Sequence, residues 1–378
     1  ILTIDAEMQS ALFSILEFVA RDRGFKAASG VVIDTTSGEI LSATTFPEFN
    51  SEILSQNSDP EETLSYLKSS AQPFFFRAFE GLYAPGSIFK PIVALAALEE
   101  KIIDPARQIL STGSIAIPNP YLPGQFSVFY DWKAHGWVDM RQALAVSSNV
   151  YFYTIGGGFG NQLGVGVKKI VDYARRLGLG EKVGVEFYES AGFLPTPEWK
   201  GKNDTLDPAW RIGDTYNLSI GQGMIQVTPL QMAVVSAAIA SEGELANIHL
   251  TEAFLSAEGG LENFETEPVK KIVISKDSFK IVEEGMRKAV EYGTASALFG
   301  LGTEVAGKTG TAELGSEKKK VNSWFIGFLP YEKPRVAISI VLEAGSAQNL
   351  IGAAYAAREF ILWMINHRPE LAEVINSP

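Results

Sequence analysis

The sequence predicts an α+β fold, in which an antiparallel sheet is flanked by helices and carries a large helical insertion lobe. Strand-like runs occur near both ends of the chain, in residues 29–45 and 304–344. Helical patterns accompany them at both termini, and the stretch between them is mostly helical in pattern. Because hairpins dominate and no β-α-β repeat is present, we expect the strands to pair antiparallel.

The first predicted elements are a helix and a hairpin. Residues 4–22 carry apolar side chains at helical spacing, on a stripe formed by Met8, Leu12, Ile15 and Val19. Asp5 is a candidate N-cap for this helix and Gly24 a candidate stop. Residues 29–45 form two β-rich runs around Thr36-Ser37-Gly38, which is typical of a hairpin.

Helices are predicted from residue 87 to 100, after Ser275, and in residues 350–365. The Pro- and Gly-rich residues 118–127 are expected to form a loop. The two ends of the chain should therefore share one sheet-containing lobe, made of residues 1–100 and 295–378. Residues 101–294 should form the mainly helical lobe, with a cleft between the two.

Composition excludes several classes of function. The chain has 378 residues, a net charge of −12 and no cysteine. A basic footprint for nucleic acid is missing, and disulfides, thiolate metal sites and a cysteine nucleophile are excluded. His135, His249 and His367 have no ligand-like spacing, so we expect no metal and no cofactor. No apolar run reaches the roughly 18 residues that a membrane span needs.

Ser87 and Lys90 have the spacing of a serine nucleophile and a lysine base one helical turn apart. Ser-x-x-Lys also begins at Ser65 and Ser316, but both copies lie in charged, solvated surroundings where a lysine keeps its high pKa. Ser87 instead opens an apolar helix, where burial disfavours the ammonium form. A structural alternative remains, in which Ser87 caps the helix and Lys90 lies on the surface.

Two further motifs favour chemistry over that alternative. Ser147 and Asn149 form a Ser-x-Asn triplet, although a second copy at residues 55–57 shows that such a triplet can simply mark a turn. Lys-Thr-Gly occurs once, in the strand-like run Lys308, Thr309, Gly310 and Thr311. Gly310 would allow another backbone to approach closely, which suits an extended peptide whose carboxylate is bound by Lys308 and the threonine hydroxyls.

Ser-x-x-Lys, Ser-x-Asn and Lys-Thr-Gly in this order resemble the signature of the penicillin-recognising serine acyltransferases. Longer stretches resemble the transpeptidase domain of class B penicillin-binding proteins, closest to elongation-type penicillin-binding protein 2, namely RAFEGLYAPGSIFKPIVALAALE, GFLPTPEWK, LSIGQGMIQVTPLQMA and GKTGTAE. The resemblance covers essentially the whole chain. Departures occur at Phe76, Ala84 and Ile88, where altered packing is expected. Some relatives have a metal site with a cysteine near residues 131–135, which this chain lacks.

The resemblance implies a role for each site residue. Ser87 would attack the penultimate D-Ala of a peptidoglycan stem peptide, and Lys90 would take its proton. Burial and the like charge of Lys308 would lower the proton affinity of Lys90. Ser147 would pass protons to the leaving nitrogen, and Asn149 would hold Lys90 and the substrate amide. The carboxylate would be bound by Lys308, Thr309 and Thr311, and the oxyanion by the N–H groups of Ser87 and Thr311.

Three other functions stay open at this point. A D,D-carboxypeptidase or a β-lactamase would use the same acylating residues but admit water, with Glu198 as the candidate base, which we interpret as structural. A non-catalytic β-lactam sensor or scaffold could keep the same pocket. The resemblance further implies binding of stem peptides and β-lactams and partnership with a membrane glycosyltransferase. It also implies a place at the outer face of the cytoplasmic membrane, with an N-terminal anchor that is not in this chain.

Overall fold

The computed structural model describes residues 1–56, 58–119, 122–257, 259–349 and 351–372. Parts of three stretches discussed above lie outside these ranges: the end of the second Ser-x-Asn triplet, the middle of residues 118–127 and the first residue of the predicted C-terminal helix. Among the described residues, no helix is both long enough and apolar enough to cross a bilayer.

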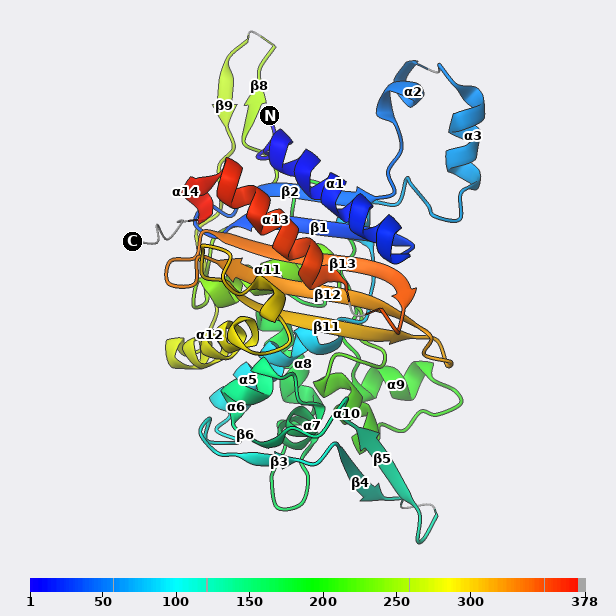
Figure 1. Ribbon diagram of the computed structural model, residues 1–378, viewed down its shortest axis with the longest axis vertical. Coiled ribbons are helices and arrows are strands. Elements are labelled where there is room, and N and C mark those ends of the chain that lie inside the picture. The colour runs from blue at the N-terminus through cyan, green and yellow to red at the C-terminus, as the bar shows by residue number, and fades with distance from the viewer. Residues whose placement is uncertain (57, 120–121, 258, 350, 373–378) are drawn as a thin grey trace.

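Within the described ranges, a five-stranded antiparallel sheet forms the centre of the upper part of the molecule (Figure 1). Its order is β11-β12-β13-β1-β2. The bounds are β1 (Ala27–Asp34), β2 (Ile40–Phe46), β11 (Ala306–Leu314), β12 (Lys320–Leu329) and β13 (Val336–Ser346). Strands from the two ends of the chain meet where β1 pairs with β13. The predicted antiparallel α+β fold is therefore confirmed.

Helices cover both faces of this sheet. Figure 1 shows α1 (Ala6–Arg23) and α13 (Ala353–His367) on one face and α11 (Pro229–Ala240) on the other. The predicted ends of α1 are confirmed, because the Asp5 side chain accepts hydrogen bonds from two first-turn N–H groups and Gly24 adopts φ +67°. Every residue of α11 is buried, as expected for a helix that is apolar on all sides.

The remaining helices lie mostly below the sheet and around its ends. They are α2 (Ser51–Gln56), α3 (Pro60–Lys68), α4 (Arg77–Glu80), the 3₁₀ turn η1 (Gly86–Phe89), α5 (Lys90–Glu99), α6 (Met140–Ala145), α7 (Asn149–Gly157), α8 (Val167–Arg176), α9 (Pro197–Asn203), α10 (Ile212–Ser219), α12 (Lys276–Glu291), the 3₁₀ turn η2 (Ser296–Leu298) and α14 (Pro369–Ala372). The predicted cap of α12 is confirmed, since the Ser275 side chain accepts from the Ser278 N–H.

The middle of the chain also contains two-stranded sheets that the sequence pattern did not predict. They pair β3 (Ile109–Ser111) with β6 (Gly136–Val138), β4 (Ser114–Pro118) with β5 (Phe126–Tyr130), β7 (Glu244–Leu245) with β10 (Lys270–Lys271), and β8 (Ala253–Leu255) with β9 (Leu261–Asn263). The prediction of a loop for residues 118–127 was wrong at both ends, because Pro118 pairs with Phe126 in the β4–β5 hairpin. Proline is tolerated there because β4 belongs to a two-stranded sheet and is therefore an edge strand.

The helix α5 positions the candidate site. Its residues from Lys90 to Ala97 are all buried, and α7, α8 and α12 pack against it. A helix enclosed in this way has little freedom to shift, because protein interiors are close-packed. The turn η1 that precedes α5 packs on β11 at the edge of the sheet. Side chains from η1, α5, α7 and β11 are therefore held in fixed relation.

Candidate active site

Ser87 lies in the 3₁₀ turn η1, directly before α5. The Lys90 N–H donates to the Ser87 carbonyl, three residues back, and not to the carbonyl four residues back as in an α-helix. This tight winding was expected from Pro91, which has no N–H to donate. Ser87 is partly exposed, whereas Gly86, Ile88 and Phe89 around it are buried. The turn therefore presents one hydroxyl group from an otherwise buried segment.

The turn is fixed to neighbouring elements by its backbone. The Gly86 N–H donates to the Gly221 carbonyl at 2.9 Å, and the Trp324 indole donates to the Ala84 carbonyl at 3.1 Å. Gly86 has φ +58°, and a Cβ there would come within 2.6 Å of the Thr311 carbonyl oxygen. Only glycine satisfies both the left-handed conformation and this close approach.

Lys90 contacts two other predicted site residues, Ser147 and Asn149. Its side chain is fully buried. The ammonium Nζ donates to the Ser147 carbonyl and to Asn149 Oδ1, each at 2.7 Å, and lies 3.2 Å from Ser147 Oγ. When the amine is neutral, the Ser147 hydroxyl can instead donate to its lone pair. The arrangement is thus compatible with a lysine that exchanges protons with Ser147.

Burial lowers the pKa of Lys90 to about 7, and the negative charge of Asp131 acts against that decrease. An amine with this pKa is half neutral near pH 7 and can accept a proton. The charge of Lys90 also helps to lower the pKa of Lys308. Because repulsion between like charges is mutual, the expected contribution of Lys308 to Lys90 stays a prediction. The structural alternative of a surface lysine at position 90 is excluded.

Ser147 sits in a strained turn between α6 and α7. Its φ is +58°, the left-handed region, which costs a non-glycine residue roughly 1–3 kcal/mol. Ser148 follows as the N-cap of α7 and accepts from the Tyr151 N–H. The turn directs the Ser147 carbonyl and the Asn149 side chain to the same amine. Strain of this kind marks functional segments, since the surroundings must over-determine it.

Asp131 holds this turn in place, and sequence reasoning missed it. Its Oδ2 accepts from Ser148 Oγ at 2.8 Å, from the Val150 N–H at 3.0 Å and from Ser111 Oγ at 3.2 Å. His135 Nε2 lies 3.6 Å from the other carboxylate oxygen, and burial lowers the pKa of this histidine. In the part of the chain that the structure describes, no group of three or more histidine, cysteine, aspartate or glutamate side chains is placed to bind a metal ion. The absence of a metal stays a prediction.

The residues Lys308, Thr309, Gly310 and Thr311 lie on β11, an edge strand of the large sheet. The Lys308 side chain is fully buried, and burial holds its pKa well below the ordinary value. Thr309 Oγ1 donates to Thr294 Oγ1 at 2.6 Å, a partner that the sequence did not suggest. Thr311 is exposed beside the strand's free edge. This stretch therefore combines a buried amine, hydroxyl groups and a backbone whose Thr309 and Thr311 carbonyls accept from Lys308 Nζ and Gln222 Nε2.

The close approach that was expected at Gly310 comes from the chain itself. A Cβ on Gly310 would lie 2.9 Å from the Pro85 carbonyl oxygen and 3.1 Å from the Ile88 nitrogen. The expectation that an external peptide lies alongside this strand stays a prediction. Because Gly310 has no side chain, β11 can pack closely against the turn that carries Ser87. An extended peptide would lie along the edge of β11 that does not pair with β12.

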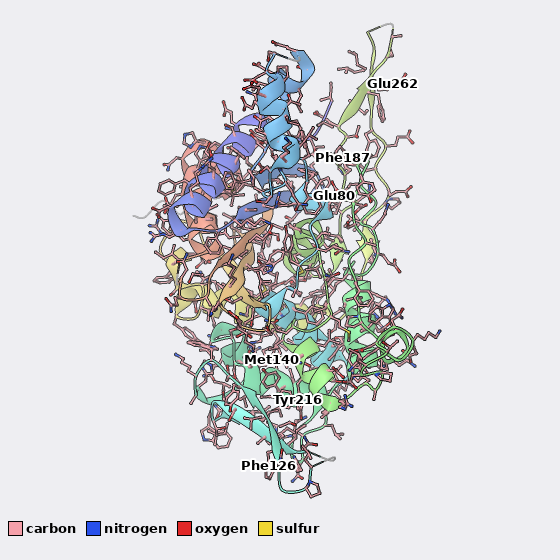
Figure 2. All side chains as sticks on the ribbon, turned by 90° about the vertical axis from the view of Figure 1, so that its right-hand side faces the viewer. Glu80, Phe126, Met140, Phe187, Tyr216 and Glu262 are labelled. Carbon is pink, nitrogen blue, oxygen red and sulfur yellow. The ribbon has the colours of Figure 1, made fainter. Side chains whose placement is uncertain are left out.

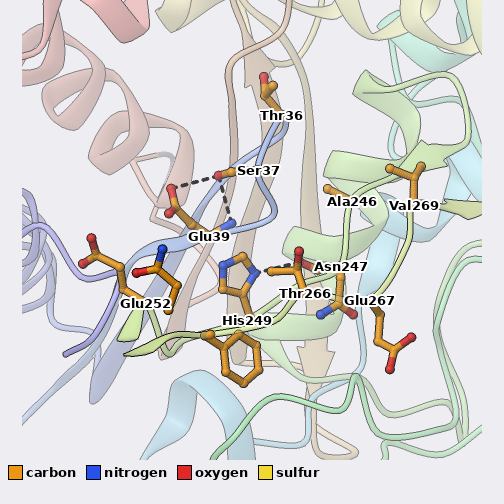
Figure 3. A pocket seen from close by; sticks show the side chains of 12 residues that line it. Thr36, Ser37, Glu39, Ala246, Asn247, His249, Glu252, Thr266, Glu267 and Val269 are labelled. Carbon is orange, nitrogen blue, oxygen red and sulfur yellow. Dashed lines mark hydrogen bonds between the residues drawn. The ribbon is translucent and has the colours of Figure 1, made fainter. Parts of the chain in front are cut away.

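A separate hollow of about 490 Å³ lies away from these residues (Figure 3). It is lined by the β1–β2 turn and by parts of residues 246–269. His249 lies in it, stacked on Phe264 with ring centroids 5.7 Å apart. None of the predicted site residues lines this hollow.

Comparison with known proteins agrees with this architecture. The family model of the penicillin-binding protein transpeptidase domain matches residues 28–361. The peptidoglycan D,D-transpeptidase MrdA of Acinetobacter baumannii is 32% identical over 89% of this chain, which spans 51% of that protein. The crystal structure of Pseudomonas aeruginosa PBP2 in complex with WCK 5153 has a TM-score of 0.81 at 27% identity, with 100% of this chain and 81% of that chain covered.

A Helicobacter pylori PBP2 in complex with MreC has a TM-score of 0.79 at 28% identity, over 99% of this chain and 64% of that chain. The chain thus belongs to the penicillin-binding protein transpeptidase domain family. Within that family it is similar to penicillin-binding protein 2 of the class B type. It spans about half the length of the curated relatives it matches.

Proposed function

We propose that this chain is a serine-type D,D-transpeptidase domain that cross-links peptidoglycan stem peptides. The observation that carries the proposal is the buried Lys90 amine, in contact with Ser147 and Asn149 and one turn from Ser87. Its pKa of about 7 provides a neutral base at physiological pH. Membership of the transpeptidase family supports this reaction over unrelated serine chemistry.

In the proposed reaction, Ser87 Oγ attacks the carbonyl carbon of the penultimate D-Ala while neutral Lys90 takes the hydroxyl proton. The oxyanion that forms is bound by the backbone N–H groups of Ser87 and Thr311, each worth about 3 kcal/mol in comparable sites. The proton returns through Ser147 to the peptide nitrogen, the C–N bond breaks, and free D-Ala leaves. Ser87 then holds the shortened stem as an ester.

A second stem peptide completes the cycle. Its amino group attacks the ester carbonyl, and its excess proton passes to the Lys90 and Ser147 pair. The bond to Ser87 Oγ then breaks as that proton is returned to the serine oxygen. The products are a cross-linked amide and a free serine. Lys308, Thr309 and Thr311 would bind the terminal carboxylate of the first stem, and Gly310 would keep the strand against the nucleophile's turn. The free edge of β11 could pair with the extended peptide.

A β-lactam would be attacked in the same way, because its carboxylate and strained amide correspond to the terminal carboxylate and the scissile amide of the stem peptide. The complex of the Helicobacter pylori relative with MreC supports a protein partner for this chain. The family resemblance also implies a membrane glycosyltransferase as a partner and a place at the outer face of the cytoplasmic membrane.

We also propose that the chain is divided into two lobes. One consists of residues 1–100 with 295–378, and the other of residues 101–294.

No observation favours a hydrolase over the transpeptidase. Glu198, the candidate base for water, lies exposed in the first turn of α9. In the described part of the chain, none of the hydrogen bonds of Lys90 or Ser147 involves Glu198. Its interpretation as a structural residue stays a prediction.

The test is an exchange reaction with a stem pentapeptide that ends in D-Ala-D-Ala and a labelled D-amino acid as acceptor. A transpeptidase incorporates the label, Ser87→Ala abolishes incorporation, and Ser65→Ala leaves it unchanged. Release of D-Ala without incorporation would identify a carboxypeptidase. A stable penicillin adduct without any reaction on the peptide would identify a sensor.

A further inference from the structure

The β4–β5 hairpin has two apolar faces, and only one of them is covered. On the inner face, Phe129 packs against Tyr153 and Tyr216, with ring centroids 5.9 and 4.9 Å away. On the outer face, Phe126, Val128 and Tyr130 are 60%, 40% and 70% exposed. Their cross-strand partners on that face are Pro118, Ala116 and Ser114. An exposed apolar face of this kind usually marks a binding surface.

This outer face begins at the candidate active site and leads away from it. The Tyr130 carbonyl accepts from Asn149 Nδ2 at 3.3 Å, so the inner end of the hairpin touches a residue that binds Lys90. Trp132, 57% exposed, donates from its indole to the Val146 carbonyl at 3.3 Å. Figure 1 shows the hairpin projecting from the body of the molecule, and Figure 2 places Phe126 at its far end.

The hairpin lies in a segment without charge. Residues 108–130 contain no Asp, Glu, Lys or Arg, although 20% of the whole chain is charged. A surface for anionic lipid would need Lys or Arg, and so would one for phosphate groups. What this segment offers beside its aromatic rings is uncharged polar groups from serine, threonine, asparagine and glutamine. The occupant should therefore be a neutral molecule with both apolar and hydrogen-bonding parts.

We propose that the outer face of the β4–β5 hairpin binds the uncharged glycan strand to which the stem peptide is attached, an inference that rests on the proposed function. Sugar rings present apolar C–H faces that cover aromatic side chains, and hydroxyl and amide groups that bond to uncharged polar residues. Phe126 and Tyr130 are four residues apart on one strand, about 13 Å at strand rise, which exceeds one sugar ring. A glycan on this face would lead its stem peptide towards Ser87.

The test compares binding of the chain to insoluble glycan strands from which the peptides have been removed. In the double variant Phe126→Thr with Val128→Thr, both side chains are exposed and threonine suits a strand, so the fold should persist. The matched control is Phe254→Thr with Leu255→Thr on the β8–β9 hairpin, where the side chains are 54% and 69% exposed. We expect about tenfold weaker glycan binding for the first pair only, which corresponds to about 1.4 kcal/mol.

Acylation by benzylpenicillin is measured on the same samples, because this small molecule does not need the hairpin. Unchanged acylation together with weakened glycan binding in the double variant supports the proposal. If the double variant unfolds, the single variant Phe126→Ser takes its place and should show a smaller loss of glycan binding. Equal glycan binding by parent, Phe126→Ser and control overturns the proposal and leaves the face to a protein partner. Failure of the parent chain to be acylated would instead refute the proposed function, whatever the glycan result.

Discussion

The rate of acylation by a β-lactam should depend on pH through Lys90. Only the neutral amine can accept the Ser87 proton, and burial lowers the pKa of Lys90 to about 7. The activity contributed by this base is therefore present above about pH 7 and is lost as the pH falls through that value. Asp131 acts in the opposite direction on Lys90, so Asp131→Asn should move the midpoint to lower pH.

The magnitude follows from the fraction of neutral amine. With a pKa of about 7, about 9% of Lys90 is neutral at pH 6 and about 91% at pH 8, so the acylation rate should rise about tenfold. At the ordinary lysine value of 10.5, only about 0.03% would be neutral at pH 7, more than a thousandfold less than in the buried site. Lys90→Arg, which stays protonated, should remove acylation across this range.

The assay is single-turnover acylation with a fluorescent penicillin, followed by stopped flow from pH 5.5 to 9. Asp104→Asn, which changes an exposed acid in the same part of the chain, serves as the control for Asp131→Asn and should leave the midpoint in place. A rate that is flat or falls between pH 6 and 8 would refute the assignment of Lys90 as the base. A midpoint near 10 would show that the lysine is not desolvated as the structure indicates.

Three further outcomes are expected. Burial holds the pKa of Lys308 well below its ordinary value, and an arriving carboxylate should raise it again, so binding should take up protons. Calorimetry of benzylpenicillin binding to Ser87→Ala, in two buffers and over a series of pH values, should show heats that differ between the buffers; equal heats throughout the series would contradict this. Gly310→Ala should slow acylation at least tenfold, because its Cβ would press on the turn that bears the nucleophile; an unchanged rate would argue against that packing. Glu343→Gln, which removes the carboxylate beside the buried Arg77, should lower the free energy of unfolding by about 2–4 kcal/mol in urea. Glu317→Gln in an exposed ion pair should change it by less than about 0.5 kcal/mol, and equal losses would contradict this expectation.

The large sheet and its covering helices could be predicted because their signals are local. Asp5 and Gly24 bound a regular apolar stripe, and the strands of the sheet are 7 to 11 residues long. The small sheets were missed because their strands have only two to five residues, too few for an alternating pattern to be distinguished from a loop. The prolines and glycines of residues 118–127 predicted a loop, although Pro118 and Phe126 pair in the hairpin.

The site was predictable where a motif stands in one short stretch, and less so where distant segments meet. From the residues alone, Lys90 could be either a catalytic base or a surface lysine. The family resemblance predicted that Ser147 and Asn149 act together with Lys90. Asp131 escaped because its partners, Ser111 and Ser148, are 20 and 17 residues away. The only available sign was an acid directly after a long uncharged run. Burial of Lys90 likewise comes from helices that meet only in the folded chain.

The most direct test of the central claim is the intact mass of the chain after incubation with benzylpenicillin. Parent protein, Ser87→Ala and Ser65→Ala are compared, since Ser65 has the same spacing to a lysine but is exposed on α3. We expect one stable adduct in the parent and in Ser65→Ala, and none in Ser87→Ala. An adduct that persists in Ser87→Ala, or no adduct in the parent protein, would contradict this claim.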